Sequence, residues 1–130
     1  MNIENIRNYC LSKAASSEDF PFDETTLVFR VCQKIFAMIS LDNTEWFVVK
    51  CNPDRAIELR DKYSSITPAF HMNKKHWNQI NIHANELEDE FIYSLIDHSY
   101  NEVVKKLPKK ERETLQQCTS CLQTEEKALE

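Results

Sequence analysis

The chain contains no glycine among its 130 residues, although average usage would give about nine. Glycine supplies the positive φ angles and close backbone approach of the Walker A loop, the Rossmann phosphate turn, the kinase Gly-rich loop and the hydrolase nucleophile elbow. These catalytic loops are therefore excluded. Positions with positive φ should fall to Asn and Asp, which tolerate them best among the other residues. The candidates are Asp42, Asn43, Asn73 and Asn81.

Long apolar runs and excess basic charge are also lacking. No run approaches the about 20 residues of a membrane-spanning helix, and the N-terminus lacks the charged start and apolar core of a signal peptide. We therefore expect a cytoplasmic protein without a membrane partner. The formal net charge is −5, whereas generic nucleic-acid-binding proteins carry excess positive charge. Any contact with nucleic acid must therefore use a local basic patch.

Cysteine is present, but not as a disulfide framework. The five cysteines stand at positions 10, 32, 51, 118 and 121, and an odd, scattered set is typical of reduced thiols in a cytosol. Cys118 and Cys121 have the spacing of a metal or redox pair. They lack a second such pair and lie in a helical pattern, which favours a structural role over zinc or redox chemistry. We expect no cofactor and no metal.

The order of predicted elements indicates an α+β domain with an antiparallel sheet covered by helices mainly on one face. Asn52 and Pro53 form a strong helix start, and Asn85 is expected to cap the long helix. We predict a single domain over residues 1–124 with a frayed tail at 125–130. The predicted elements are a helix over 2–15, a break at 16–21, strands at 26–31, 35–41 and 46–49 with a two-residue turn at 42–43, a helix from 53, a strand over 75–83, a long helix ending at 105–106 and a final helix from 108.

The segment from Ile66 to Ile80 combines aromatic, histidine, lysine and asparagine side chains between apolar runs. A packed core does not need so many polar groups in one place. Strand alternation puts Ile80 and Ile82 on the helix-covered face and Trp77 on the open face, where we expect it at the surface. His76 and Asn78 would then lie at the rim of the covered face.

An ordered set of short motifs resembles the MmcQ/YjbR family of small bacterial proteins, with a match from about residue 2 to 112. The resemblance implies a CyaY-like fold, also described as a double wing. It also implies DNA binding, as family members are commonly described on the basis of fold similarity. It supplies no catalytic residues. Asp23 and Gln33 stand where the family often has glycine, so those two turns must be built differently. The motifs are Tyr9–Cys10, Asp19–Phe22, Lys34–Met38, Asn52–Pro53, Pro68–Asn78, Asp97–Tyr100 and Leu107–Pro108.

The leading hypothesis is a non-enzymatic DNA-binding protein. Lysines of the 66–80 segment would neutralise phosphates, its tryptophan would stack on a base, and its asparagines would bond a base edge or sugar. In the alternative, purely structural role, the tryptophan packs in the core and the lysines only keep a turn exposed to solvent. A second basic cluster, 105–112, either complements a helix dipole or extends the contact surface. The predicted nucleic-acid-binding residues are Lys74, Lys75, His76, Trp77, Asn78, Arg30 and Lys34.

Two other function classes stay open. A protein- or small-ligand-binding module would use the open sheet face around Trp46 or Phe47, and Trp77. An enzyme would need a nucleophile, for which Cys51 with His71 or His76 is the conceivable pair. The pair His71 and His76 alone is too small for a closed metal site. We expect His98, in the long helix, to make a structural hydrogen bond.

Overall fold

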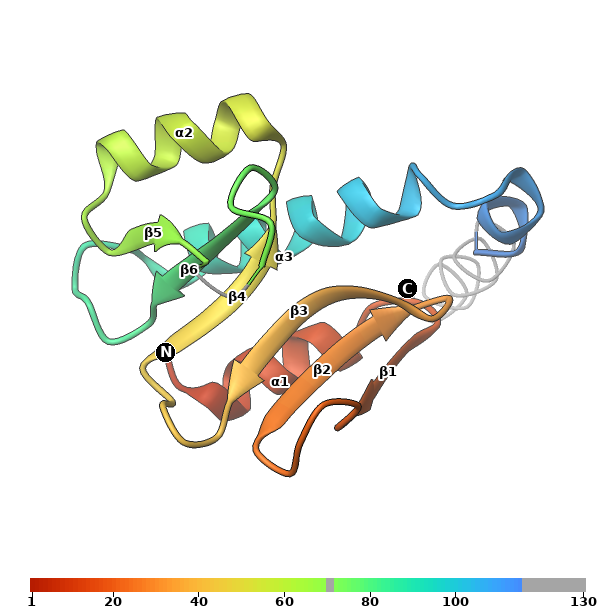
Figure 1. Ribbon diagram of the computed structural model, residues 1–130, viewed down its shortest axis with the longest axis horizontal. Coiled ribbons are helices and arrows are strands. Elements are labelled where there is room, and N and C mark those ends of the chain that lie inside the picture. Colours follow the sequence, from red (N-terminus) through yellow and green to blue (C-terminus); the bar gives the residue numbers. More distant parts are fainter. Residues whose placement is uncertain (70–71, 116–130) are drawn as a thin grey trace, which may run out of the picture.

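In a computed structural model of the chain, residues 1–69 and 72–115 are described (Figure 1). The backbone of 109–115 is also helical. The elements, in chain order, are α1 (Ile3–Leu11), β1 (Ser16–Asp19), β2 (Thr26–Val31), β3 (Lys34–Ser40), β4 (Trp46–Lys50), α2 (Pro53–Lys62), β5 (Ile66–Pro68), β6 (Trp77–Asn81) and α3 (Asp89–Val104).

One six-stranded sheet organises the molecule, in the order β1-β2-β3-β4-β6-β5. Every neighbouring pair is antiparallel. Helix α3 packs on β3 and β4, α1 on β1 and α3, and α2 on β5. Figure 1 shows α1 and α3 behind the sheet and α2 along one end of it. The predicted α+β class, the three consecutive antiparallel strands and the one-sided helix cover are confirmed.

The core lies between the sheet and the helices. Phe47 and Val49 of β4 and Ile80 of β6 point into it, because alternate strand residues share a face. The predicted burial of Ile80 and Ile82 on the helix-covered face is confirmed. The expectation that Phe47 could serve the open face is wrong, since its side chain is in the core.

Local sequence signals predicted the start of α2 correctly, but not the start of α3 or the end of α1. The Asn52 side chain accepts hydrogen bonds from the backbone N–H groups of Asp54 and Arg55, with Pro53 at the first helical position, which confirms the predicted start of α2. Asn85 does not cap α3. That helix begins four residues later, after Glu88, which makes no side-chain cap bond. Helix α1 ends at Leu11, earlier than predicted. None of the helices in the described ranges is long and apolar enough to cross a membrane.

The prediction that Asn and Asp take the positive φ angles in this glycine-free chain is wrong. Within residues 1–69 and 72–115, positive φ falls on Ala15 (58°), Cys32 (47°) and Gln33 (70°), and not on Asn or Asp. Cys32 and Gln33 are the two-residue loop of the β2–β3 hairpin, where a type I′ turn needs positive φ at both positions. The expected break at 16–21 contains a strand, β1. Residues 42–43 are part of a five-residue connection, 41–45, and not a two-residue turn.

Candidate functional site

The candidate site begins where β3 and β4 part. Their paired register ends at Ala37 and Val49, so the next backbone groups need other partners. The Ser99 hydroxyl of α3 supplies them: it donates to the Phe36 carbonyl (2.5 Å) and accepts from the Lys50 N–H (2.8 Å). Ser99 is fully buried. This bridge holds the C-terminal half of α3 against the ends of both strands.

The loop before β6 lies against the same end of β4. The Cys51 N–H donates to the His76 carbonyl (2.6 Å), and Lys50 is the register partner of Trp77. The end of β4 therefore contacts two segments that are distant in sequence, the 74–76 loop and α3.

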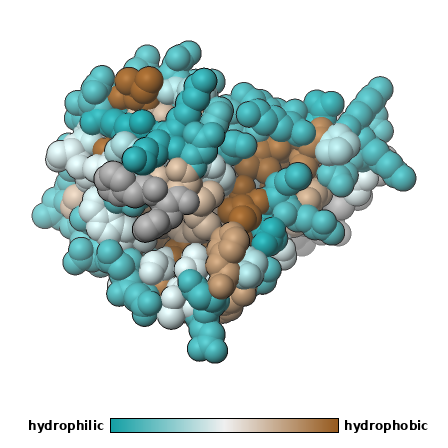
Figure 2. All heavy atoms as spheres, viewed as in Figure 1, coloured by the Kyte–Doolittle hydropathy of each residue, from teal (hydrophilic) through white to brown (hydrophobic). Residues whose placement is uncertain are grey.

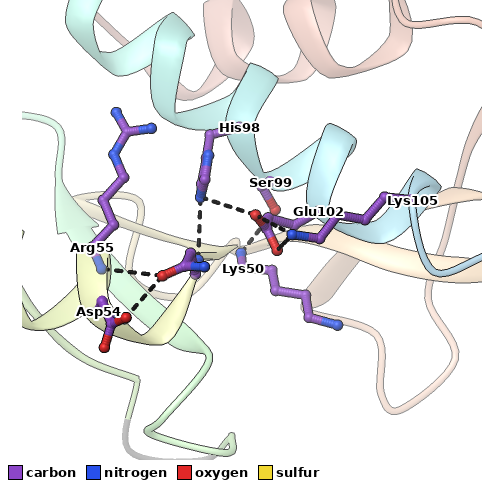
Figure 3. A network of polar contacts seen from close by, with 8 residues as sticks. Lys50, Asp54, Arg55, His98, Ser99, Glu102 and Lys105 are labelled. Carbon is purple, nitrogen blue, oxygen red and sulfur yellow. Dashed lines mark hydrogen bonds and ion pairs between the residues drawn. The ribbon is translucent and has the colours of Figure 1, made fainter.

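A polar network joins α3 to the start of α2, as Figure 3 shows. His98 Nε2 accepts the Asn52 N–H at 3.1 Å, which confirms the expected structural hydrogen bond. Burial, followed by the positive charge of Arg55, lowers the pKa of His98 below its ordinary value. His98 is therefore neutral at pH 7, as an acceptor must be, and its 3.7 Å approach to Glu102 is not an ion pair there.

Basic side chains from four segments gather around the end of β4, and we call this group the cationic patch. Burial and then the charges of Lys106, Lys105 and Lys34 lower the pKa of Lys50. Burial and then the charges of Lys106, Lys50 and Lys75 lower the pKa of His76. Shifts with these causes require like charges to lie close to Lys50 and His76. The cationic patch consists of the lysines Lys34, Lys50, Lys75, Lys105 and Lys106, together with the titratable His76 that lies among them.

Glu102 is the acid within this group. Its carboxylate accepts a hydrogen bond from Lys105 Nζ at 2.9 Å. Burial raises the pKa of Glu102, but the hydrogen bond and charge of Lys105, with His98 and Lys106, outweigh it and the pKa is lowered. Glu102 is therefore ionised at neutral pH and offsets one of the positive charges.

The structure brings together part of the predicted nucleic-acid-binding set. Lys34, Lys75 and His76 belong to the cationic patch, and Lys74 is exposed beside them. Arg30 does not join them: its guanidinium pairs with Asp19 at 3.0 Å and donates to the Gln33 carbonyl at 2.8 Å.

Lys50 was not among the predicted site residues. Its position at the end of a strand, beside a helix start, was only a weak indication of a role in the site. Lys105 and Lys106 were predicted only as a separate cluster.

Two predicted contact residues are not at the surface. Trp77 lies on the open side of the sheet, as alternation predicted, but is only 9% exposed, so the expectation of an exposed stacking ring is wrong. Asn78 is 1% exposed, not at the rim. Arg60 of α2 accounts for the buried position of Asn78, because its Nε donates to the Asn78 side chain (2.6 Å), and its Nη2 donates to the Trp77 and Lys74 carbonyls. These residues anchor the loop that carries Lys75 and His76.

The cysteine and histidine hypotheses find little support. Burial raises the pKa of the Cys51 thiol, the opposite of an activated nucleophile. Among residues 1–69 and 72–115, no group of three His, Cys, Asp or Glu side chains could hold a metal ion. His71, Cys118 and Cys121 lie outside the described residues.

The open face of the sheet is hollowed. Figure 2, seen from this side, shows apolar side chains gathered over the middle of the face within a hydrophilic surround. Trp46 and Val48 of β4 and Met38 of β3 line a hollow of about 710 Å³. Trp46 therefore lies where the ligand-binding alternative placed it. The other lining residues are Phe22, Asp23, Thr26, Ser40, Asn43, Ala69, Met72 and Gln79.

Comparison with known proteins gives consistent relatives. The family model YjbR matches residues 11–102. The uncharacterized protein YjbR of Escherichia coli (strain K12) is 31% identical over 118 residues, 90% of this chain and 99% of that protein. The uncharacterized protein YbdF of Escherichia coli O157:H7 is 33% identical over 94 residues, 72% of this chain and 76% of that protein.

Solved structures agree with the sequence relatives. The crystal structure of Deinococcus radiodurans protein DR2400 has a TM-score of 0.81 at 33% identity, covering 87% of this chain and 86% of that chain. A crystal structure of a Pseudomonas syringae protein has a TM-score of 0.65 at 27% identity, covering 78% and 98%. None of these names states a reaction or a ligand.

Proposed function

This chain belongs to the YjbR family, and we propose that it binds nucleic acid, DNA in the first instance, through the cationic patch. The observation that carries the proposal is the convergence of basic side chains from β3, β4, the loop before β6 and the end of α3 at one place. Phosphate contacts of this kind supply most of the affinity of non-specific nucleic-acid binding. A local patch can do this although the net charge is −5.

The proposed contact set differs from the predicted one. Lys34, Lys75 and His76 remain in it, and Lys50, Lys105 and Lys106 are added. Lys74 stays as a neighbouring cation on the same loop. Trp77 and Asn78 act only by holding that loop, because both are buried.

A non-enzymatic role and a cytoplasmic location belong to the same proposal. The names of the relatives contain no enzymatic activity. Cys10 and Cys51 are free thiols, which is typical of proteins kept in a reducing compartment.

The test is a fluorescence-anisotropy titration of labelled single-stranded and duplex DNA at low salt. We expect binding below about 100 μM, the weak end of non-specific affinities. Lys106→Gln, and more strongly the double variant Lys50→Gln/Lys106→Gln, should weaken it. The matched control is Lys62→Gln, because Lys62 ends the 10-residue helix α2, about 15 Å from the patch end of that helix. Absence of binding, or equal losses in Lys106→Gln and Lys62→Gln, would reject the proposal.

A second candidate function is small-ligand binding by the open sheet face, and the hollow beside Trp46 and Met38 favours it. Binding there would rest on apolar burial, so it would be insensitive to salt and to Lys106→Gln. Isothermal titration at low and high salt separates the two candidates.

A further inference from the structure

The hollow and the cationic patch adjoin each other along one strand. Trp46, Val48 and Lys50 are alternate residues of β4, on the face opposite Phe47 and Val49. Trp46 and Val48 line the hollow, and Lys50 belongs to the patch. Alternate residues on a strand are about 6.6 Å apart, a distance that one extended nucleotide spans. An anionic ligand held at Lys50 can therefore extend directly into the hollow.

The walls of the hollow suit a flat, partly polar group. Trp46, Met38, Val48 and Met72 supply apolar surface, and a volume of about 710 Å³ is within the range of about 300–1,000 Å³ found for small-molecule sites. Polar groups stand on the same side of the sheet. The Gln79 amide lines the hollow. Thr67 Oγ1, the register neighbour of Gln79, is buried without a hydrogen-bond partner within the described part of the chain.

We propose that the hollow and the cationic patch form one site for single-stranded nucleic acid, in which an unpaired base enters the hollow while the adjoining phosphates lie on the patch. The inference rests on the proposed function, to which it adds the class of nucleic acid. A base in a duplex is stacked and paired, and it cannot enter a hollow without being extruded. A duplex would therefore contact the patch alone, whereas a single strand would contact both parts.

Trp46 is the residue that discriminates these two modes. Stacking of a base on an aromatic side chain contributes about 1–3 kcal/mol, and 1.4 kcal/mol corresponds to a tenfold change in affinity. We expect Trp46→Ala to weaken single-strand binding about tenfold and to change duplex binding less than about twofold. Trp46→Phe keeps a ring and should restore most of the loss, which separates stacking from damage to the fold. Phe20→Ala is the control, because Phe20 is an exposed aromatic residue that does not line the hollow.

The experiment is an anisotropy titration of a labelled single strand and of the same strand annealed to its complement. Tighter binding of the single strand, with a loss on Trp46→Ala confined to that strand, supports the inference. Equal affinity for both forms, or no effect of Trp46→Ala on the single strand, overturns it while leaving the patch as a nucleic-acid site. Absence of binding to either form rejects the proposed function itself.

Discussion

Ser99 is a single side chain that satisfies two backbone groups where β3 and β4 part. Its hydroxyl bonds the Phe36 carbonyl and the Lys50 N–H, and it is fully buried. Removing it would leave both groups buried without partners, at about 1–3 kcal/mol each. We predict that Ser99→Ala lowers the free energy of unfolding, measured by urea denaturation, by about 2–6 kcal/mol.

Ser94 of the same helix provides the control. Its hydroxyl bonds only the Phe91 carbonyl, within α3, and that carbonyl keeps its place in the helix when the side chain is shortened. Ser94→Ala should therefore change the free energy of unfolding by less than about 0.5 kcal/mol. Comparable losses for the two serines would contradict the bridging role of Ser99.

His98 couples the fold to pH. Its pKa in the folded protein is lowered by burial and by Arg55 and Lys105, against the opposite effect of Glu102. An unfolded histidine titrates near pH 6.5, so between that value and the lower folded one the unfolded chain binds more protons. The stabilising contribution is therefore complete above about pH 6.5 and is lost as pH falls toward the folded pKa.

We predict that the free energy of unfolding falls between about pH 7.5 and 5.5, and falls less in His98→Gln. Glutamine keeps an acceptor for the Asn52 N–H but does not titrate. His76, whose pKa is also lowered, should keep part of the dependence. His83→Gln is the control, since His83 is exposed at the other end of β6. An identical pH dependence in wild type and His98→Gln would contradict the prediction.

At the scale of elements, the β2–β3 hairpin holds two residues in conformations that glycine or asparagine would adopt more easily. Gln33 has φ of 70°. Positive φ costs a residue with a side chain about 1–2 kcal/mol, while glycine adds entropy to the unfolded chain. We predict that Gln33→Gly raises the free energy of unfolding by about 0.5–1 kcal/mol in urea denaturation.

A second glycine substitution tests whether the gain is specific to that turn. Asn43 lies in the β3–β4 connection and does not have positive φ. Asn43→Gly should therefore leave stability unchanged or reduce it. A gain at Asn43 equal to that at Gln33 would show that backbone strain is not the cause.

The secondary-structure elements that the sequence predicted correctly are those determined by residues close together along the chain. The Asn52–Pro53 start of α2 needs only residues within three positions, and β2, β3 and β4 have continuous apolar composition. Strand β1 has the sequence SSED, which has no strand composition, and it forms because β2 offers an edge. Its Glu18 also bonds Arg7 of α1. Such partners are distant in sequence and could not be found from local pattern.

At the scale of the whole molecule, the sequence predicted several residues of the candidate site but not the contacts that bring them together. Alternation put Trp77 and Ile80 on the correct faces, but the burial of Asn78 depends on Arg60, which reaches its side chain from another element. Likewise Lys75 and Lys106 were recognised as members of two clusters. The Ser99 bridge and the Cys51–His76 bond bring those clusters together, and neither is visible in the sequence.

A patch of converging cations on a protein of net charge −5 should bind with a strong dependence on salt. Each phosphate neutralised on a single strand contributes about −0.7 to the slope of log K against log salt concentration. If Lys50 and Lys106 each neutralise one phosphate, the double variant Lys50→Gln/Lys106→Gln should have a slope less negative by about 1.4. Anisotropy titrations at several concentrations between about 50 and 200 mM salt measure it. Lys62→Gln should keep the wild-type slope, because that lysine lies at the far end of α2. A double variant that binds more weakly with an unchanged slope would mean that these lysines shape the site without touching phosphate.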